Sequence, residues 1–188
     1  MNAERPRAPE RIELGGGAFL RALTPDDAPM VFATVDRERA RLRPWLPWVD
    51  RSLGPADTRG FLEATAATDG REYIFGIWAA DGFAGAMGLH TDPGHRSAEI
   101  GYWIDAAHEG QGLVTRSARA LVTVAFGGLG MHRVWITADP RNRRSCAVAE
   151  RLGFVLEGVR REDTLTDGRF RDTALYAILD REWRPEER

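Results

Sequence analysis

Residues 108–122 read HEGQGLVTRSARALV and place two glycines, Gly110 and Gly112, directly before an apolar run with helical spacing. Glycine costs about 0.5–1 kcal/mol against alanine in regular structure. A helix N-terminus offers unpaired N–H groups and partial positive charge, and glycine lets an anion approach them closely. The stretch is therefore either a tight strand-to-helix turn or an anion site. No lysine follows as in a P-loop, and Thr115 replaces the third glycine of a dinucleotide fingerprint.

The patterns on both sides of this stretch predict an α/β fold, a mixed sheet with helices on its faces. The predicted order is β-α-α-β-β-β-α-β-α-β-β. Strands are expected at 17–23, 72–80, 82–90, 98–105, 132–138, 154–159 and 172–179, and helices at 24–35, 57–67, 113–126 and 145–152. Asp81-Gly82 and Asp167-Gly168 indicate tight hairpins. The strand, helix and strand around the two glycines favour a right-handed crossover between parallel strands.

Length and composition indicate one globular domain spanning 1–188, with a core at 11–183 and flexible termini. The chain has 188 residues, 43% hydrophobic and 29% charged, and a formal net charge of −2. This charge gives no general attraction to nucleic acid. The single cysteine, Cys146, cannot form an intrachain disulfide. The start MNAERPRAPE has no apolar core typical of a secretory signal, and no run of about 18 apolar residues predicts a membrane span. We therefore expect a cytoplasmic protein without nucleic-acid or membrane partners.

Five motifs between residues 98 and 158 follow one another in a familiar order: AEIGYWID, EGQGLV, HRVWITA, N-x-x-S and ERLGF-x-x-EG. Together they resemble the core of the GNAT superfamily of acyl-CoA-dependent N-acyltransferases. LRPWLPWVD and EGVRRE…DGRFRDTALYAIL narrow the resemblance, over residues 11–183, to the RimJ/RimL-type branch that acetylates N-termini of ribosomal proteins. The family loop usually reads [QR]-x-x-G-x-[GA]. Here Glu109 and Val114 stand at its two ends, so Glu109 is expected to point away from a bound diphosphate.

The resemblance implies that acetyl-CoA binds along this core. The loop would hold the diphosphate, mainly through backbone N–H groups. Two parallel strands would splay apart beside it, so that pantetheine pairs with freed backbone and one N–H faces the thioester oxygen. The residues expected to bind the cofactor are Tyr102, Trp103, Ile104, Glu109, Gly110, Gln111, Gly112, Leu113, Val114, Thr115, Asn142 and Ser145.

Glu99 is the first choice for the general base. On a strand it shares one face with Gly101 and Trp103, while the neighbouring residues face the other way. A carboxylate in this apolar strand is either a base, which resembles other branches of the superfamily, or a structural residue that pairs with an arginine or lies at the sheet edge. Thr164 stands where the RimL-like pattern has a glutamate, so no second base is predicted.

Asn142 and Ser145 are the candidates for handling the leaving group. By resemblance, Ser145 would donate a proton to the departing sulfur and Asn142 would hydrogen-bond the pantetheine arm. Both residue types are also ordinary helix caps, and the two roles can coexist.

Trp45 and Trp48 either wall the acceptor pocket or fill the core. The arginines Arg141, Arg143 and Arg144 either reach the 3′-phosphate of CoA or form a solvated face. The four histidines show no ligand spacing, so no metal is expected. No Cys–His pairing is evident that would make Cys146 a nucleophile.

The resulting hypothesis is an acetyl-CoA-dependent N-acetyltransferase in which a primary amine attacks the thioester directly. The leading acceptor is a protein or peptide N-terminus. Neutralising an α-amine at pH 7 costs about 1.4 kcal/mol, against about 4.6 for lysine. The alternatives are a small amine, such as a polyamine, amino acid or aminoglycoside, and a CoA-binding sensor without catalysis. A groove open at both ends would suit peptides, and a closed acidic cup would suit polyamines. A homodimer is implied by resemblance alone.

Overall fold

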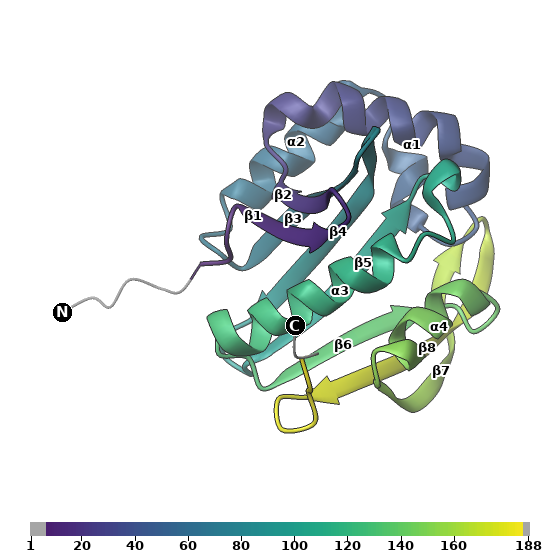
Figure 1. Cartoon of the computed structure of the whole chain (residues 1–188). Coiled ribbons are helices and arrows are strands. Elements are labelled where there is room, and N and C mark those ends of the chain that lie inside the picture. The colour runs from purple at the N-terminus through teal and green to yellow at the C-terminus, as the bar shows by residue number, and fades with distance from the viewer. Residues whose placement is uncertain (1–6, 186–188) are drawn as a thin grey trace.

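The computed structural model describes residues 7–185, and its centre is one eight-stranded mixed sheet (Figure 1). The strands are β1 (Arg11–Gly15), β2 (Ala18–Ala22), β3 (Glu72–Ala79), β4 (Gly82–Asp92), β5 (Ser97–Ile104), β6 (Arg133–Ala138), β7 (Val155–Thr166) and β8 (Arg169–Leu179). The helices are α1 (Ala28–Leu42), α2 (Pro55–Ala66), α3 (Leu113–Thr123) and α4 (Arg143–Arg151). The sheet order is β1-β2-β3-β4-β5-β6-β8-β7. The mixed α/β class predicted from the sequence is confirmed.

The predicted element order lacks one strand, β1, and is wrong at this point. Residues 15–17 are three glycines with φ of +78°, +61° and +77°, and they make the reversal between β1 and β2. Ile12 and Leu14 alternate with polar residues and pack against the core. A five-residue edge strand gives a weak signal, but the glycine triplet marks its turn. The expected flexibility of the termini falls partly on residues 1–6 and 186–188, which lie outside the described residues.

Helix α1 is longer than predicted and holds the proline-rich segment that follows it. It is preceded by a 3-10 turn at Pro25–Asp27, where Asp27 Oδ2 accepts the Thr24 N–H at 2.8 Å. Near its end, Arg39 donates to the carbonyl of Val49 at 2.5 Å and to that of Ser52 at 2.6 Å. These bonds fasten a second 3-10 turn, Pro47–Arg51, beside α1.

The alternation of β5 separates two packed layers. Ala98 and Ile100 belong to the larger apolar core, which includes residues of α3 and α4. Trp103 faces the opposite way and packs with Val31 and Val35 of α1. Figure 1 shows α3 lying across one side of the sheet, with α1 and α2 at its other side.

Strands β5 and β6 pair in parallel over only three residues, from Ser97↔Arg133 to Glu99↔Trp135. Beyond Glu99 the two strands part, while β5 stays paired with β4 on its other edge up to Ile104. The β6-facing edge of β5 after Glu99 is therefore free of a neighbouring strand.

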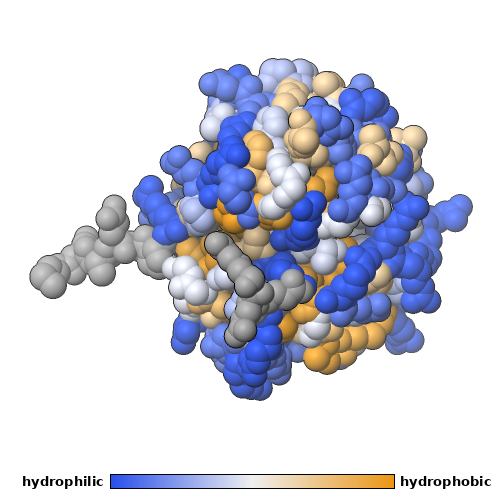
Figure 2. Space-filling view, viewed as in Figure 1, coloured by the Kyte–Doolittle hydropathy of each residue, from blue (hydrophilic) through white to orange (hydrophobic). Residues whose placement is uncertain are grey.

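An apolar area lies at the lower right of the view, over the β7–β8 region (Figure 2). Exposed large apolar side chains on these two strands include Val155, Leu165 and Phe170. No helix within residues 7–185 combines the length and apolar character needed to cross a membrane.

Candidate active site

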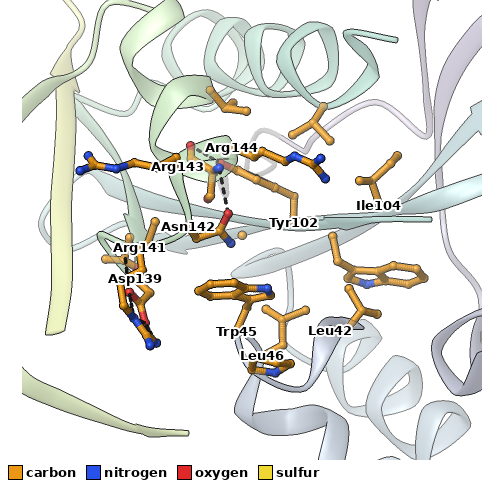
Figure 3. A pocket seen from close by; sticks show the side chains of 18 of the residues that line it. Leu42, Trp45, Leu46, Tyr102, Ile104, Asp139, Arg141, Asn142, Arg143 and Arg144 are labelled. Carbon is orange, nitrogen blue, oxygen red and sulfur yellow. Dashed lines mark hydrogen bonds and ion pairs between the residues drawn. The ribbon is translucent and has the colours of Figure 1, made fainter. Parts of the chain in front are cut away.

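A cleft of about 1050 Å³ opens where β5 and β6 part. Its walls come from the end of α1 and the segment after it, from β5, from the start of α3, and from α4. The cleft brings together most of the predicted site residues: Trp45, Tyr102, Trp103, Ile104, Glu109, Gly110, Gly112, Leu113, Val114, Thr115, Asn142 and Ser145. Figure 3 shows Leu42, Trp45 and Leu46 on one side of this cleft, with Tyr102, Asn142 and Arg144 on the other.

The two glycines before α3 are required by the backbone. Gly110 has φ +76° and Gly112 has φ +72°, a region that L side chains rarely adopt. A Cβ at either position would meet nothing within 4 Å, so the space beside the loop is open. The first turn of α3 follows at Leu113 and lines the cleft. Open space at a helix N-terminus suits a phosphate-bearing ligand.

Asp105 fixes the approach to this loop. Its Oδ1 accepts the Ala107 N–H at 2.9 Å, and Arg37 of α1 forms an ion pair with the same carboxylate. Burial disfavours the charged form, but the Ala107 amide and the Arg37 guanidinium together lower the pKa of Asp105. The loop is therefore fastened to α1 by a carboxylate that stays ionised at neutral pH.

Glu109 lines the cleft, and its carboxylate is held by arginines of two other elements. Arg41 Nη1 of α1 donates to Glu109 Oε1 at 2.6 Å, and Arg144 Nη1 of α4 donates to Oε2. Arg41 also donates to the Ile104 carbonyl. Two guanidinium groups thus balance the carboxylate, which removes the repulsion of an anion that an unpaired glutamate would exert.

Tyr102, Ser145 and Asn142 form one hydrogen-bonded group on the cleft wall. The Tyr102 hydroxyl lies 3.0 Å from Ser145 Oγ and donates to the Ser145 carbonyl at 3.1 Å. Asn142 Oδ1 accepts the Ser145 N–H at 3.2 Å and caps α4. Burial raises the pKa of Tyr102 to about 12, so its hydroxyl stays protonated at neutral pH. The predicted residues Asn142 and Ser145 therefore bond each other directly, and Tyr102 bonds Ser145 as a third member of the group. The sequence predicted Tyr102 as a cofactor-binding residue but did not predict this bond of its hydroxyl.

Glu99 lies at the point where β5 and β6 part, but it is not on the cleft wall. Its Oε1 accepts the Thr137 hydroxyl at 2.8 Å. Across the β4–β5 ladder Glu99 stands opposite His90. A cross-strand neighbour of this kind cannot be found without the register of the two strands.

The remaining predicted residues occupy different places. Trp45 is 37% exposed and faces the cleft, with the Arg141 guanidinium 5.7 Å from its ring centre. Trp48 packs against the smaller apolar core and lines a second cavity. Gln111 is not on the cleft wall, and its Nε2 donates to the Ala107 carbonyl at 3.1 Å.

The three arginines of the predicted run also differ. Arg141 is paired with Asp139 at 2.9 Å, and Arg144 with Glu109. Arg143 lines the cleft and shows no side-chain bond within the described part of the chain. Arg143 is therefore the member of the run with a side chain free to meet an anion.

A second cavity, of about 510 Å³, lies between the sheet and the helices α1 and α2. Gly101, Tyr102, Trp103 and Leu46 line both this cavity and the cleft. Of its walls the sequence indicated Trp48 as a candidate acceptor-pocket residue, but the cavity itself was not predicted, because its walls come from six separate elements. Across residues 7–185, no group of three or more His, Cys, Asp or Glu side chains is arranged to hold a metal ion.

The chain is similar to several acetyltransferases. A family model described as an acetyltransferase (GNAT) domain matches residues 18–155. The putative ribosomal N-acetyltransferase YdaF of Bacillus subtilis (strain 168) is 36% identical over 174 residues, covering 89% of this chain and 93% of that protein. The ribosomal-protein-serine acetyltransferase of Escherichia coli (strain K12) is 27% identical over 175 residues, covering 91% and 98%.

One solved structure is RimL, a ribosomal L7/L12 alpha-N-protein acetyltransferase in complex with coenzyme A. It is 27% identical to this chain, with a TM-score of 0.87 over 90% of this chain and 98% of that one.

Proposed function

The chain belongs to the GNAT family of acetyltransferases, and on this premise we propose that it transfers acetyl from acetyl-CoA to the α-amine at a protein N-terminus. The names of the relatives support a ribosomal protein as acceptor, and with it a place in the cytoplasm. The cleft beside the glycine loop is the observation that carries the proposal. It is open at Gly110 and Gly112, where a diphosphate needs room.

Acetyl-CoA supplies an activated acetyl thioester and, on transfer, a thiolate that must be protonated. The backbone amides at the start of α3 would bind its diphosphate, with Arg144 held near the loop by Glu109 and Arg143 elsewhere on the cleft wall. The free edge of β5 from Tyr102 to Ile104 would hold the pantetheine arm in place of a neighbouring strand. One N–H of this edge would stabilise the oxyanion, a contribution of about 3–4 kcal/mol.

Ser145 would relay a proton to the departing sulfur: its Oγ gives up its proton while it takes the proton of Tyr102, and Tyr102 is reprotonated from solvent. If the Tyr102 proton bonds the Ser145 carbonyl, the Ser145 hydroxyl can donate to Tyr102. If Tyr102 instead donates to Ser145 Oγ, the serine proton is released toward the cleft. The high pKa of Tyr102 keeps it a donor throughout the neutral range. Asn142 holds the start of α4 in place through the Ser145 N–H.

Glu99 would accept the proton of the attacking amine. Because it does not reach the cleft wall, a water molecule must carry that proton. An α-amine has a pKa of about 8, so at pH 7 roughly a tenth of it is already neutral, and a weak base is enough. A lysine side chain, at about 10.4, would demand a stronger one.

The test is acetyl-CoA turnover, followed as thiol release, with N-terminal peptides and with polyamines, amino acids and an aminoglycoside as acceptors. We expect release with peptides, and the acetyl group on the α-amine by mass spectrometry. Fast turnover with small amines alone would replace the proposed acceptor. Binding of acetyl-CoA without release from any amine would favour the sensor. Light scattering of the same sample tests the homodimer that the family resemblance implies.

A further inference from the structure

Two glycines face each other across the middle of the sheet. Gly88 of β4 pairs with Gly101 of β5, and Ile74 of β3 pairs with Gly88. Since paired residues share a face, Gly88 and Gly101 lie side by side toward α1 and α2, on the face that carries Trp103. Glycine inside a strand weakens it and commonly marks a place where a ligand comes close. Neither glycine has a positive φ, so the backbone does not require them.

The glycine pair forms the floor of the 510 Å³ cavity. A Cβ on Gly101 would meet nothing within 4 Å, which shows open space above it. At Gly88 the imidazole of His90 leans over the strand, with Nε2 at 2.7 Å from the position of a Cβ. Val31 and Val35 of α1 and Leu62 of α2 form the roof. Two large helices thus cover the glycines without filling the space.

The chemistry of this cavity is apolar. Within residues 7–185, Asp57 is the one carboxylate on its wall. That carboxylate already accepts the Leu53 N–H at 2.8 Å and the Gly54 N–H at 2.9 Å, at the start of α2. His90 lies at the rim, 3.7 Å from the carboxylate of Glu72. A polyamine would find a single carboxylate here, already bonded to two backbone N–H groups and with the cationic Arg51 on the same wall, whereas a hydrocarbon group would be removed from water.

The cavity adjoins the cofactor cleft at the free edge of β5. Gly101, Tyr102 and Trp103 line both spaces. Under the proposed function this is where the thioester and the attacking amine meet. Glu99, the proposed base, stands beside Gly101 on the same face of β5, opposite His90. An amine placed at this junction would direct the substituent on its α-carbon into the apolar cavity.

We infer that this cavity selects the acceptor, which is a primary amine carrying a large apolar substituent, as at a peptide beginning with leucine, methionine or phenylalanine. The inference rests on the proposed function and adds the identity of the first residue. Each buried methylene contributes about 0.8 kcal/mol, so the three additional carbons of leucine over alanine correspond to a preference of about 50-fold in kcat/KM.

The first experiment compares purified full-length chain on pentapeptides that differ only in the first residue: Leu, Met, Phe, Ala, Ser and Gly. We expect kcat/KM to be at least about tenfold higher for the three large apolar residues than for the three small ones. Equal or higher values for serine or alanine would overturn the inference. Leucinamide and phenethylamine are included as small amines with the same substituents. If their kcat/KM values equal those of the peptides, the role of the apolar cavity is supported and the proposal of a protein N-terminus as acceptor is contradicted.

The second experiment fills the cavity. Val31→Phe places a ring in its roof and should lower kcat/KM for the leucine peptide at least about tenfold, with little change for the glycine peptide. Val31 does not line the cofactor cleft, so acetyl-CoA affinity by calorimetry should stay the same. The matched control is Val159→Phe on the exposed strand β7, which should change neither value. An unchanged order of peptides in folded Val31→Phe would overturn the inference.

Gly101→Ala is the second variant, in case Val31→Phe does not fold. Its methyl group enters open space at the mouth of the cavity, with no backbone strain. We expect the preference for leucine over glycine to fall about fivefold or more, because a methyl group narrows the entrance. A preference that stays at the wild-type value would overturn the inference. If the cavity instead held the acyl group of the thioester, the protein would use butyryl-CoA faster than acetyl-CoA. That result would also overturn the inference.

Discussion

The glycines before α3 and those in the strands that face α1 are present for different physical reasons. On the α3 side, Gly110 and Gly112 adopt positive φ, so the backbone conformation itself demands glycine. On the α1 side, Gly88 and Gly101 lie in extended strands, where any residue could adopt the conformation. A Cβ at Gly101 would enter open space, whereas one at Gly88 would meet the His90 imidazole at 2.7 Å. The first pair leaves a polar mouth suited to phosphate, and the second leaves an apolar hollow. A glycine at positive φ marks a turn of the backbone, whereas a glycine in an extended strand, as at Gly101, leaves space that a side chain would otherwise occupy.

The largest effect is expected from charge in the polar mouth. Gly112→Asp places a carboxylate where the diphosphate should lie and should weaken acetyl-CoA binding by about 1000-fold, equal to about 4 kcal/mol. Calorimetry measures the affinity. Gly130→Asp is the matched control, because Gly130 has φ +66°, open space and no place on the cleft wall. Equal losses of acetyl-CoA affinity in both variants would show that backbone strain alone causes the loss. That result would contradict the binding of the diphosphate at this loop.

Ser145→Ala tests whether the hydroxyl group on the wall of the cofactor cleft takes part in the chemical step. Loss of the proton donor should lower kcat about 100-fold, with acetyl-CoA affinity nearly unchanged. Tyr102→Phe should have a smaller effect, and adding it to Ser145→Ala should cost little more, because both act on one proton. Thiol release gives the rates. A wild-type rate in Ser145→Ala would leave the residue a structural part of α4 only.

Glu99→Gln tests the proposed base on β5 and should lower turnover about tenfold, with little change in acetyl-CoA affinity. The loss should be greatest near pH 7 and shrink toward pH 9, since an α-amine with a pKa of about 8 then needs no base. Thiol release between pH 6 and 9 measures it. Rates equal to wild type across that range would exclude Glu99 as the base.

The smallest effect separates the two kinds of glycine directly. Gly112→Ala forces alanine to a φ of +72° and should destabilise the fold by about 1 kcal/mol, or roughly 2–4 °C in Tm. Gly101→Ala meets neither strain nor contact and should raise the Tm slightly, because alanine restricts the unfolded chain. Thermal unfolding by circular dichroism measures both. Equal shifts would mean that the distinction between conformation and volume is wrong.

Most of the fold could be predicted from local signals. Asp167-Gly168 marked the β7–β8 turn, where both residues have positive φ, and the apolar spacing after Gly112 marked α3. Strand β1 was missed because five residues at a sheet edge bury little. In the site, the motif residues Asn142 and Ser145 lie on the cleft wall, where the sequence predicted a cofactor site. The arginine partners of Glu109 were not predicted. Arg41 lies 68 residues from Glu109, and no pattern links them.

By itself the sequence determined the helices and the strands other than β1, the glycine loop and the family, since each depends on residues that are close along the chain. The tertiary structure alone decided the register that sets Gly88 beside Gly101, the arginines that neutralise Glu109, and the hydroxyl of Tyr102 at Ser145. These contacts join separate elements, and a shift of one residue in pairing would send each side chain to the opposite face. Local chemistry can be read along a chain, but the shape of a cavity exists only once the strands are paired.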